Sequence, residues 1–200
     1  MTSILSQSFY ARDSLEVAPE LVGALVRRDE VLLRITEVEA YRWPDDTACH
    51  ACKGQTPRNA TMFGPPGHAY VYLCYGIHWM LNFVTNRVGE GAAVLIRSAE
   101  LIEGQEVVAC RRGGKSGPVL LTGPGKLGQA LQLTRAQDGT PLFGGGAIEV
   151  FKGERPAKLL YGPRVGIDNA HWKHVKAPWR FALADSEWVT HRKGLRRYVA

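Results

Sequence analysis

The sequence predicts an α+β fold: a single domain with one curved antiparallel β-sheet, surrounded by helices and long loops. Strand-like segments are the most numerous, and three of them, over residues 68–76, 77–86 and 91–101, follow one another directly. Segments with helical spacing are few and separate from these strands. No internal repeat and no linker divides the 200 residues, so we expect one domain over residues 1–200.

The N-terminal part of the chain predicts a helix followed by a strand. Over residues 13–28, apolar side chains recur at helical spacing, Asp13 or Ser14 can act as the N-cap, and arginines occupy the last turn. Pro19 interrupts the start of this helix because proline has no N–H to donate. Residues 30–41, EVLLRITEVEAY, then read as a strand.

After residue 41 a long irregular stretch is followed by shorter elements. Residues 42–67 contain prolines at positions 44, 57, 65 and 66, and so long a connection inside a compact domain is usually functional or disordered. Beyond the three consecutive strands, we expect helices over residues 102–112 and 122–133. The remaining predicted strands cover residues 147–151, 163–167 and 179–183.

The composition is that of an ordinary soluble globular protein, with 45% hydrophobic and 22% charged residues. No run of about eighteen apolar residues is present, so no transmembrane helix is expected. The first residues also lack the apolar stretch of a secretory signal. We therefore expect a cytoplasmic protein.

The chain is basic, with a formal net charge of +6 and a pI near 9.3. Part of the excess lies in a C-terminal tail from about residue 190, which contains HRKGLRRY, and part in CRRGGKSG at residues 110–117. Flexible basic segments suit contacts with phosphates. A solvated charged tail explains the C-terminal run equally well.

The cysteines do not predict a metal site. Cys49 and Cys52 form a C-x-x-C pair, but a structural zinc ion needs a second pair of ligands. His171 and His174 are the only candidates, and they are spaced one residue closer than the usual finger pattern. We expect reduced thiols and no bound metal.

Three polar side chains at the end of the first strand raise a question of function. Glu37, Glu39 and Tyr41 occupy alternating positions and so share one strand face. Because a buried, unpaired carboxylate is costly, this face is either solvated or lines a site. Two carboxylates can act as general acid and base on a glycosidic bond. Their spacing along the strand, roughly 6.5–7 Å, does not distinguish such a pair from one catalytic acid with a solvated neighbour.

A strand rich in tyrosine, HAYVYLCYG, follows at residues 68–76. Tyr70 and Tyr72 share one face, and Tyr75 precedes Gly76, where the chain is expected to turn and a side chain can project. A tyrosine stripe most often packs within a half-buried sheet. In a basic protein, aromatic platforms also stack nucleobases. The residues alone leave both interpretations open.

Six motifs, taken together, resemble the alkyladenine DNA glycosylase family, also called the 3-methyladenine or methylpurine DNA glycosylases. They are, in chain order, EVEAYRWPDDTACH, GQTPRN, MFGPPGHAYVYLCYGIHWMLNFVTN, AAVLIRSAEL, GPGKLGQAL and APWRFAL, and the resemblance as a whole runs from about residue 8 to about residue 190. The resemblance implies a monomeric enzyme without metal or organic cofactor that acts on double-stranded DNA. It would flip a damaged purine into a pocket and hydrolyse the N-glycosidic bond, in the nucleoid, or in the nucleus of a eukaryote.

The resemblance also implies roles for individual residues in the pocket. Glu39, in EAY, would be the general base that activates water, and Arg97, in LIRS, would help to hold Glu39 and that water. Tyr41 and His50 would stack on one face of the flipped base, and Tyr72 on the other. No lysine matches a Schiff-base position, so the enzyme would be monofunctional.

Further carried-over residues would contact the DNA or select the base. Tyr75 would wedge into the gap that the flipped nucleotide leaves. Asn82 would crowd the exocyclic amino group of guanine and so disfavour normal guanine. Thr56, Arg58 and Lys126 would contact the DNA backbone.

Two other functions compete with this interpretation. One is a non-catalytic nucleic-acid-binding module, in which Glu39 is only structural. The other is hydrolysis of a sugar by the pair Glu37 and Glu39, with Trp43 as a sugar platform. The family scheme uses one catalytic carboxylate, so we expect a structural or solvated role for Glu37.

Overall fold

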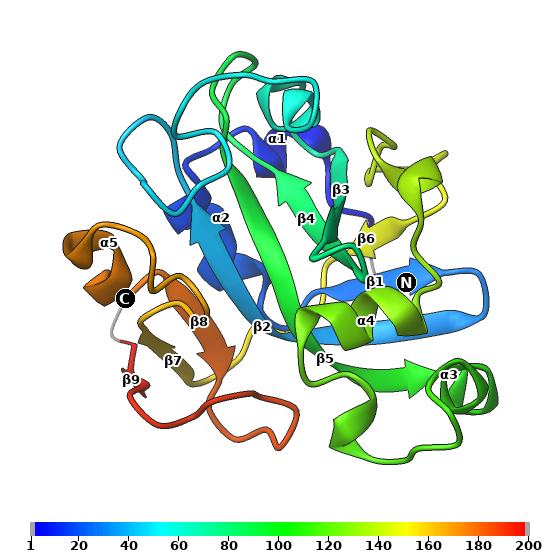
Figure 1. Ribbon diagram of the computed structural model, residues 1–200. Helices are drawn as coiled ribbons and strands as arrows, with labels where there is room; N and C mark the ends of the chain where they lie inside the picture. The colour runs from blue at the N-terminus through cyan, green and yellow to red at the C-terminus, as the bar shows by residue number, and fades with distance from the viewer. Residues whose placement is uncertain (1–2, 199–200) are drawn as a thin grey trace.

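The structure, a computed structural model, describes residues 3–198. Its strands join one antiparallel sheet with helices around it, which confirms the predicted α+β class (Figure 1). The described elements are, in chain order, α1 (Gln7–Tyr10), α2 (Ser14–Leu21), β1 (Leu25–Arg28), β2 (Val31–Tyr41), η1 (Ala60–Phe63), β3 (Ala69–Cys74), β4 (His78–Val84), β5 (Ala93–Glu103), α3 (Gln105–Arg111), η2 (Pro118–Leu120), α4 (Pro124–Ala130), η3 (Arg135–Gln137), β6 (Glu149–Phe151), β7 (Leu159–Gly162), α5 (Trp172–Lys176), β8 (Arg180–Leu183) and β9 (Arg196–Arg197).

Strand β2 is the centre of the sheet, in which the main strand order is β3-β4-β5-β2-β8-β7-β9. One edge of β2 pairs with β5 along almost its whole length. The other edge is divided, because β1 pairs with residues 31–34 and β8 pairs with residues 37–39. The sheet therefore forks along β2, with β1 and β6 on one branch and β8, β7 and β9 on the other (Figure 1).

An irregularity in β2 changes which of its side chains face the core. The pairing register between β2 and β5 shifts on both sides of Glu37, and Thr36 and Arg97 are left without a partner in the ladder. Before the shift, the odd-numbered residues up to Ile35 join the main core, and after it the even-numbered residues from Val38 do so. Since side chains alternate along a strand, this one-residue offset turns Glu37, Glu39 and Tyr41 away from the main core.

Helices α2 and α4 cover opposite faces of the sheet, and Figure 1 shows α2 behind β2 and α4 in front of the sheet. Helix α4 lies very close to β4 because two of its residues are glycines. A Cβ atom on Gly128 would lie 2.0 Å from the carbonyl oxygen of Trp79, and one on Gly125 would lie 2.8 Å from the ring of His78. Glycine at these positions therefore permits the contact that holds the start of α4 beside β4.

The helix predicted over residues 13–28 is wrong in its second half. Helix α2 ends at Leu21, and Gly23 then adopts a φ of 95°, which carries the chain away from the helix. Residues 25–28 instead form β1, which pairs with β2 as a hairpin. The apolar residues of 25–28 thus belong to a strand that pairs with β2, the next strand in the sequence.

The strand predicted over residues 163–167 is also wrong. The strand of this region is β7, over Leu159–Gly162, and the residues after it form a loop in which Gly166 has a φ of 75°. The other predicted strands and helices are confirmed to within a few residues at each end. Among residues 3–198, no helix has the length and apolar character needed to cross a bilayer.

The described part of the basic C-terminal tail folds back onto the sheet. Arg196 and Arg197 form β9 against β7, and the guanidinium of Arg192 donates to the carbonyl oxygens of Ala184 and Ser186. Tail residues therefore complete one edge of the sheet.

Candidate active site

A cavity of about 300 Å³ lies beside the last residues of β2 and extends toward β3 and β4. Its remaining walls come from the loop after β2, from residues 165–167 and from the start of α4. Seven residues singled out in the sequence meet in its lining: Glu39, Tyr41, His50, Tyr72, Tyr75, Asn82 and Arg97. The fold therefore brings together side chains that are up to 58 positions apart, counted from Glu39 to Arg97.

Four neighbouring strands contribute one row of side chains to the cavity. The register places Tyr70 of β3 opposite Asn82 of β4, and Asn82 opposite Leu95 of β5. Leu95 is in turn opposite Glu39 of β2. Because side chains of paired residues point to the same face of a sheet, all four line the cavity. The amide of Asn82 also donates to the carbonyl oxygen of Tyr70 at 3.0 Å, which fixes its orientation.

The side chain of Glu39 is fully buried, and both of its carboxylate oxygens have hydrogen-bonding or ionic partners. Oε1 accepts a hydrogen bond from the backbone N–H of Val165 at 2.7 Å and lies 3.2 Å from Nη1 of Arg97. Oε2 accepts from the hydroxyl of Tyr41 at 3.0 Å. Burial, followed by the charge of Glu39, raises the pKa of Tyr41, so this phenol stays protonated and can donate. Glu39 is thus a carboxylate held in one orientation in the cavity wall.

Arg97 bridges two carboxylates. Its Nε donates to Oε1 of Glu37 at 3.0 Å while its Nη1 faces Glu39. Burial acts to lower the pKa of Arg97, but the charges of Glu39 and Glu37 outweigh it and the pKa is raised, so the guanidinium keeps its charge. A cation between two acids allows both to be charged inside the protein.

Glu37 is enclosed by the protein and does not line the cavity. The expected solvated role is therefore wrong and the structural one remains. Burial raises its pKa, but Arg97, hydrogen bonds from Thr190 and the charge of Arg180 act against this, and the pKa is lowered overall. Since Glu37 cannot reach a sugar in the cavity, the Glu37–Glu39 pair does not form a glycosidase site.

Aromatic side chains form one wall of the cavity. The rings of Tyr70 and Tyr72 stack at a centroid distance of 5.3 Å and an angle of 28°. His50 meets Tyr72 edge-on at 4.5 Å, and its Nδ1 lies 3.1 Å from the hydroxyl of Tyr70. Desolvation, and then the charge of Arg58, lower the pKa of His50, which favours a neutral ring at pH 7.

The turn between β3 and β4 carries the most exposed large side chain at the cavity rim. Tyr75 is 89% exposed and Ile77, beside it, is 71% exposed. Tyr75 and Gly76 have φ values of 49° and 71°, and the N–H of Ile77 donates to the carbonyl of Cys74 at 3.1 Å. Positive φ at both central residues is the pattern of a type I′ hairpin turn, which here projects a tyrosine into solvent.

Sequence reasoning missed the buried ion pair of Arg164 and Asp46, whose guanidinium lies against the ring of Tyr41 in the cavity lining. The guanidinium of Arg164 donates to both carboxylate oxygens of Asp46, at 2.5 and 2.7 Å, and both side chains are fully buried. Arg164 also donates to the carbonyl of Ala40 and lies 4.6 Å from the centre of the Tyr41 ring. The pair ties the loop after β2 to the loop that supplies the N–H of Val165. The acidic run WPDD and the arginine of GPRVG were visible in the sequence, but nothing in it paired them.

The three candidates for DNA-backbone contacts lie outside the cavity lining. Thr56 and Arg58 are exposed on the loop before η1, and Arg58 donates to the carbonyl of Leu73 at 3.2 Å, near the hairpin turn. Lys126 lies in the first turn of α4, where burial and then the charges of Arg112 and Lys115 lower its pKa.

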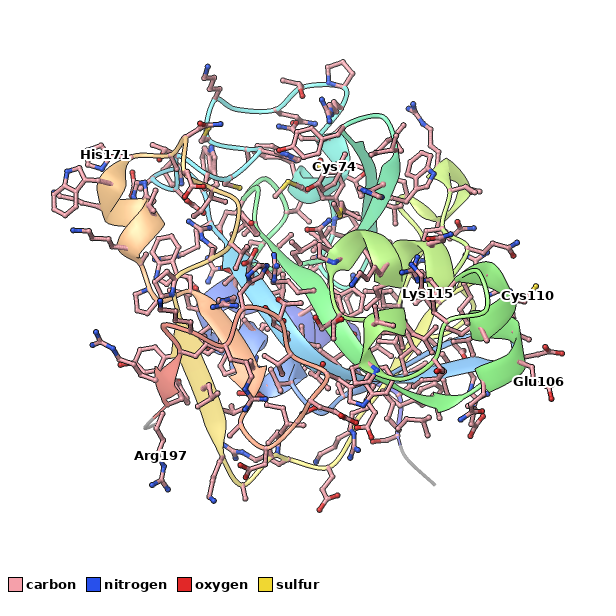
Figure 2. All side chains as sticks on the ribbon, turned by 60° about the horizontal axis from the view of Figure 1, so that its bottom comes forward. Cys74, Glu106, Cys110, Lys115, His171 and Arg197 are labelled. Atoms are coloured by element: carbon pink, nitrogen blue, oxygen red, sulfur yellow. The ribbon has the colours of Figure 1, made fainter. Side chains whose placement is uncertain are left out.

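Other charged and metal-binding groups do not converge on the cavity. Within the described residues, no group of three or more potential metal ligands comes together. Burial raises the pKa of the Cys49 thiol to about 12, which keeps it protonated. Figure 2 shows Arg197 of the basic tail at the far side of the molecule from Cys74, which lines the cavity.

Comparisons with known proteins identify the family. The family model for methylpurine-DNA glycosylase matches residues 8–187. A candidate 3-methyladenine DNA glycosylase of Nitrosococcus oceani is 55% identical over 98% of this chain and 98% of its own. The DNA-3-methyladenine glycosylase of Arabidopsis thaliana is 54% identical over 95% of this chain and 75% of its own. The chain therefore belongs to the methylpurine-DNA glycosylase family.

Proposed function

We propose that this chain is a monofunctional DNA glycosylase that starts base-excision repair by removing alkylated or deaminated purines from duplex DNA. The lesion class would include 3-methyladenine, 7-methylguanine, hypoxanthine and ethenoadenine. The observation that carries the proposal is the setting of Glu39, a buried carboxylate held by Arg97, Val165 and Tyr41 in a cavity with aromatic walls. Family membership supports DNA as the substrate, and the two relatives named above carry 3-methyladenine in their names.

In the proposed reaction Glu39 takes a proton from a water molecule as the oxygen of that water attacks C1′ of the damaged nucleotide. The new C1′–O bond forms while the C1′–N bond breaks, and the base leaves with the electron pair. A purine methylated at N3 or N7 is cationic in DNA, so this electron pair neutralises it and no acid is required. A neutral base such as hypoxanthine needs a proton or hydrogen bonds as it departs.

The aromatic side chains would hold the flipped base. Tyr72 would stack on one face of the base and Tyr41 and His50 on the other, while Asn82 would stand against the exocyclic amino group of guanine. A base stacks at about 3.4 Å from each neighbour, so the walls around it lie about 7 Å apart. His50 now touches the edge of Tyr72 at 4.5 Å, and its ring therefore turns aside when a base enters.

Exposed groups around the cavity would bind and distort the duplex. Tyr75 projects from the rim and is large enough to fill the gap left by a flipped nucleotide. Thr56, Arg58 and Lys126 would contact phosphates on either side of it. One chain carries all of these groups, so we expect the monomer to be active.

The test is a single-turnover excision assay on four duplex oligonucleotides, each with one of the four lesions, followed by alkali to cleave abasic sites. The wild-type chain should cleave at least one of them. Glu39→Gln should bind the same duplex with unchanged affinity and lose about 10²–10⁴-fold in rate, the usual contribution of a general base. Glu103→Gln, the same change at an exposed carboxylate of β5, should keep the wild-type rate.

The rival function is a non-catalytic nucleic-acid-binding module. Lesion binding by the wild-type chain without cleavage of any duplex would favour it and would leave Glu39 with a structural role only.

A further inference from the structure

We propose that Glu37 is a positioning residue for base excision. It holds Arg97 in the orientation in which Arg97 contacts Glu39, and Thr190, near the C-terminal end, holds Glu37 in turn. The inference rests on the proposed function, because it concerns the base that this function assigns to Glu39. It gives a role in the reaction to two residues that do not line the cavity.

The Glu37 carboxylate is fully buried and has donors on both oxygens. Oε1 accepts from Nε of Arg97 at 3.0 Å and from Nη1 of Arg180 at 3.1 Å. Oε2 accepts from the hydroxyl of Ser98 at 3.0 Å and from the backbone N–H of Thr190 at 2.8 Å. The hydroxyl of Thr190 lies 2.9 Å and 2.8 Å from the two oxygens. A carboxylate with this many donors has a single orientation and so provides a fixed point inside the protein.

The orientation of Arg97 depends on this fixed point. Its guanidinium is planar, and contacts from Nε to Glu37 and from Nη1 to Glu39 together determine how the plane is turned. Arg97 also has no partner in the ladder between β2 and β5, so the regular backbone pairing of its neighbours does not extend to it. Without Glu37, the guanidinium is free to turn about its own side chain and to approach Glu39 differently.

The C-terminal segment is anchored to the same cluster. Arg180 donates to the carbonyl oxygens of Thr190 at 3.3 Å and of His191 at 3.1 Å, in addition to its contact with Glu37. The hydroxyl of Thr36 donates to the carbonyl of Trp188 at 2.5 Å. Thr190 is therefore held on the sheet from two sides, and its N–H and hydroxyl reach Glu37 in a defined place.

The experiment measures single-turnover release of 3-methyladenine and 7-methylguanine from duplex DNA methylated with dimethyl sulfate. These cationic bases leave without an acid, so the rate of release reports the activation of water by the general base. Glu37→Gln should bind the methylated DNA like the wild type and release the bases about 10–100-fold more slowly, the range found when a partner of a functional ligand is removed.

A purely structural Glu37 would give a different result. Glu37→Gln would then melt at a lower temperature, but the folded protein would release the bases at the wild-type rate, and this outcome overturns the inference. Wild-type protein that releases neither base would overturn the proposed function instead, so the two failures are distinguishable.

A second pair of variants decides the matter if Glu37→Gln does not fold. Thr190→Val removes the hydroxyl and keeps the N–H that donates to Glu37, whereas Thr190→Ser keeps both. We expect Thr190→Val to excise about 10-fold more slowly at unchanged affinity, the effect of one hydrogen bond to a charged group, and Thr190→Ser to match the wild type. Equal rates for Thr190→Val and the wild type would overturn the inference.

Discussion

Glu37 and Glu39 are two positions apart on one strand face, and the groups around each decide what that carboxylate can do. Glu37 accepts from two guanidinium groups and from Thr190, and the protein encloses it. Glu39 shares Arg97 with it but lines the cavity, where its other oxygen accepts a hydrogen bond from the hydroxyl of Tyr41. An acid that is saturated with donors serves as an anchor, and one that retains access to a cavity can exchange a proton.

Tyr75 is a residue at which function and backbone preference disagree. Its φ of 49° belongs to the left-handed region, which costs a non-glycine residue roughly 1–2 kcal/mol. Its side chain is almost fully exposed, so packing does not compensate for this cost. A strained, exposed aromatic residue beside a cavity is typical of a position kept for contact with a substrate.

We therefore predict that Tyr75→Gly raises the free energy of unfolding by about 1 kcal/mol, because glycine adopts this φ without strain. Affinity for a lesion-containing duplex should fall at least about 10-fold, since the wedge is lost. Urea denaturation and fluorescence anisotropy measure the two effects. Tyr75→Ser keeps the strain and loses the wedge, so it should weaken binding without the gain in stability. Unchanged affinity in both variants would contradict the wedge role.

At the scale of the element, α4 shows how a short helix is placed by its glycines. Gly128 approaches a backbone carbonyl, which cannot move without disturbing β4, whereas Gly125 approaches the exposed side chain of His78. The position of α4 matters for the site because Pro124 lines the cavity and Lys126 stands outside it. The two glycines of one helix thus differ in what surrounds them.

This difference gives a matched pair of variants. Gly128→Ala should lower the free energy of unfolding by about 2–3 kcal/mol, since its Cβ would stand 2.0 Å from the carbonyl oxygen of Trp79. Gly125→Ala should cost less than about 1 kcal/mol, because His78 can move aside and alanine has the higher helix propensity. Chemical denaturation of both variants checks the order. Equal stabilities would mean that β4 adapts freely to α4.

Local patterns in the sequence predicted the strand of Glu39 and Tyr41, the hairpin at Tyr75 and the irregular loop of His50, because each depends on residues close together in the chain. The register offset at Thr36 could not be predicted, since alternation by itself would have placed Glu37 on the same face as the core residues before it. The hydrogen bond from the N–H of Val165 to Glu39 could not be predicted either. This N–H comes from a loop far along the chain, in a segment whose apolar residues had predicted a strand.

At the scale of the whole molecule, the positive charge is distributed unevenly. In the basic C-terminal tail, Arg196 and Arg197 form β9, and Arg197 lies far from the cavity side of the protein (Figure 2). Around α4, burial and then the charges of Arg112 and Lys115 lower the pKa of Lys126, so three positive charges lie close together there. Mutual repulsion of this kind favours a bound polyanion, which relieves it. The side of the molecule that carries α4 is therefore the better candidate for contact with phosphates.

Salt dependence tests this placement. Lys126→Gln should weaken binding to duplex DNA with and without a lesion to the same extent, and should reduce the slope of log K against log salt concentration by about 0.9. Lys158→Gln also removes one positive charge, but from the residue just before β7, where Lys158 pairs with Asp185. This control variant should leave the slope unchanged. Filter binding at several salt concentrations gives both slopes. A reduced slope for Lys158→Gln but not for Lys126→Gln would place the DNA on another face.

Because of the register offset at Thr36, the insertion or deletion of a residue here has a different effect from a substitution. A substitution at this position does not change the number of residues, so the later side chains of β2 keep their faces of the sheet. Loss or gain of a single codon between Ile35 and Glu37 would instead move each later side chain of β2 to the opposite face of the sheet. Val38 would then point toward the cavity and Glu39 toward the core. Related sequences should therefore keep the length of this segment constant.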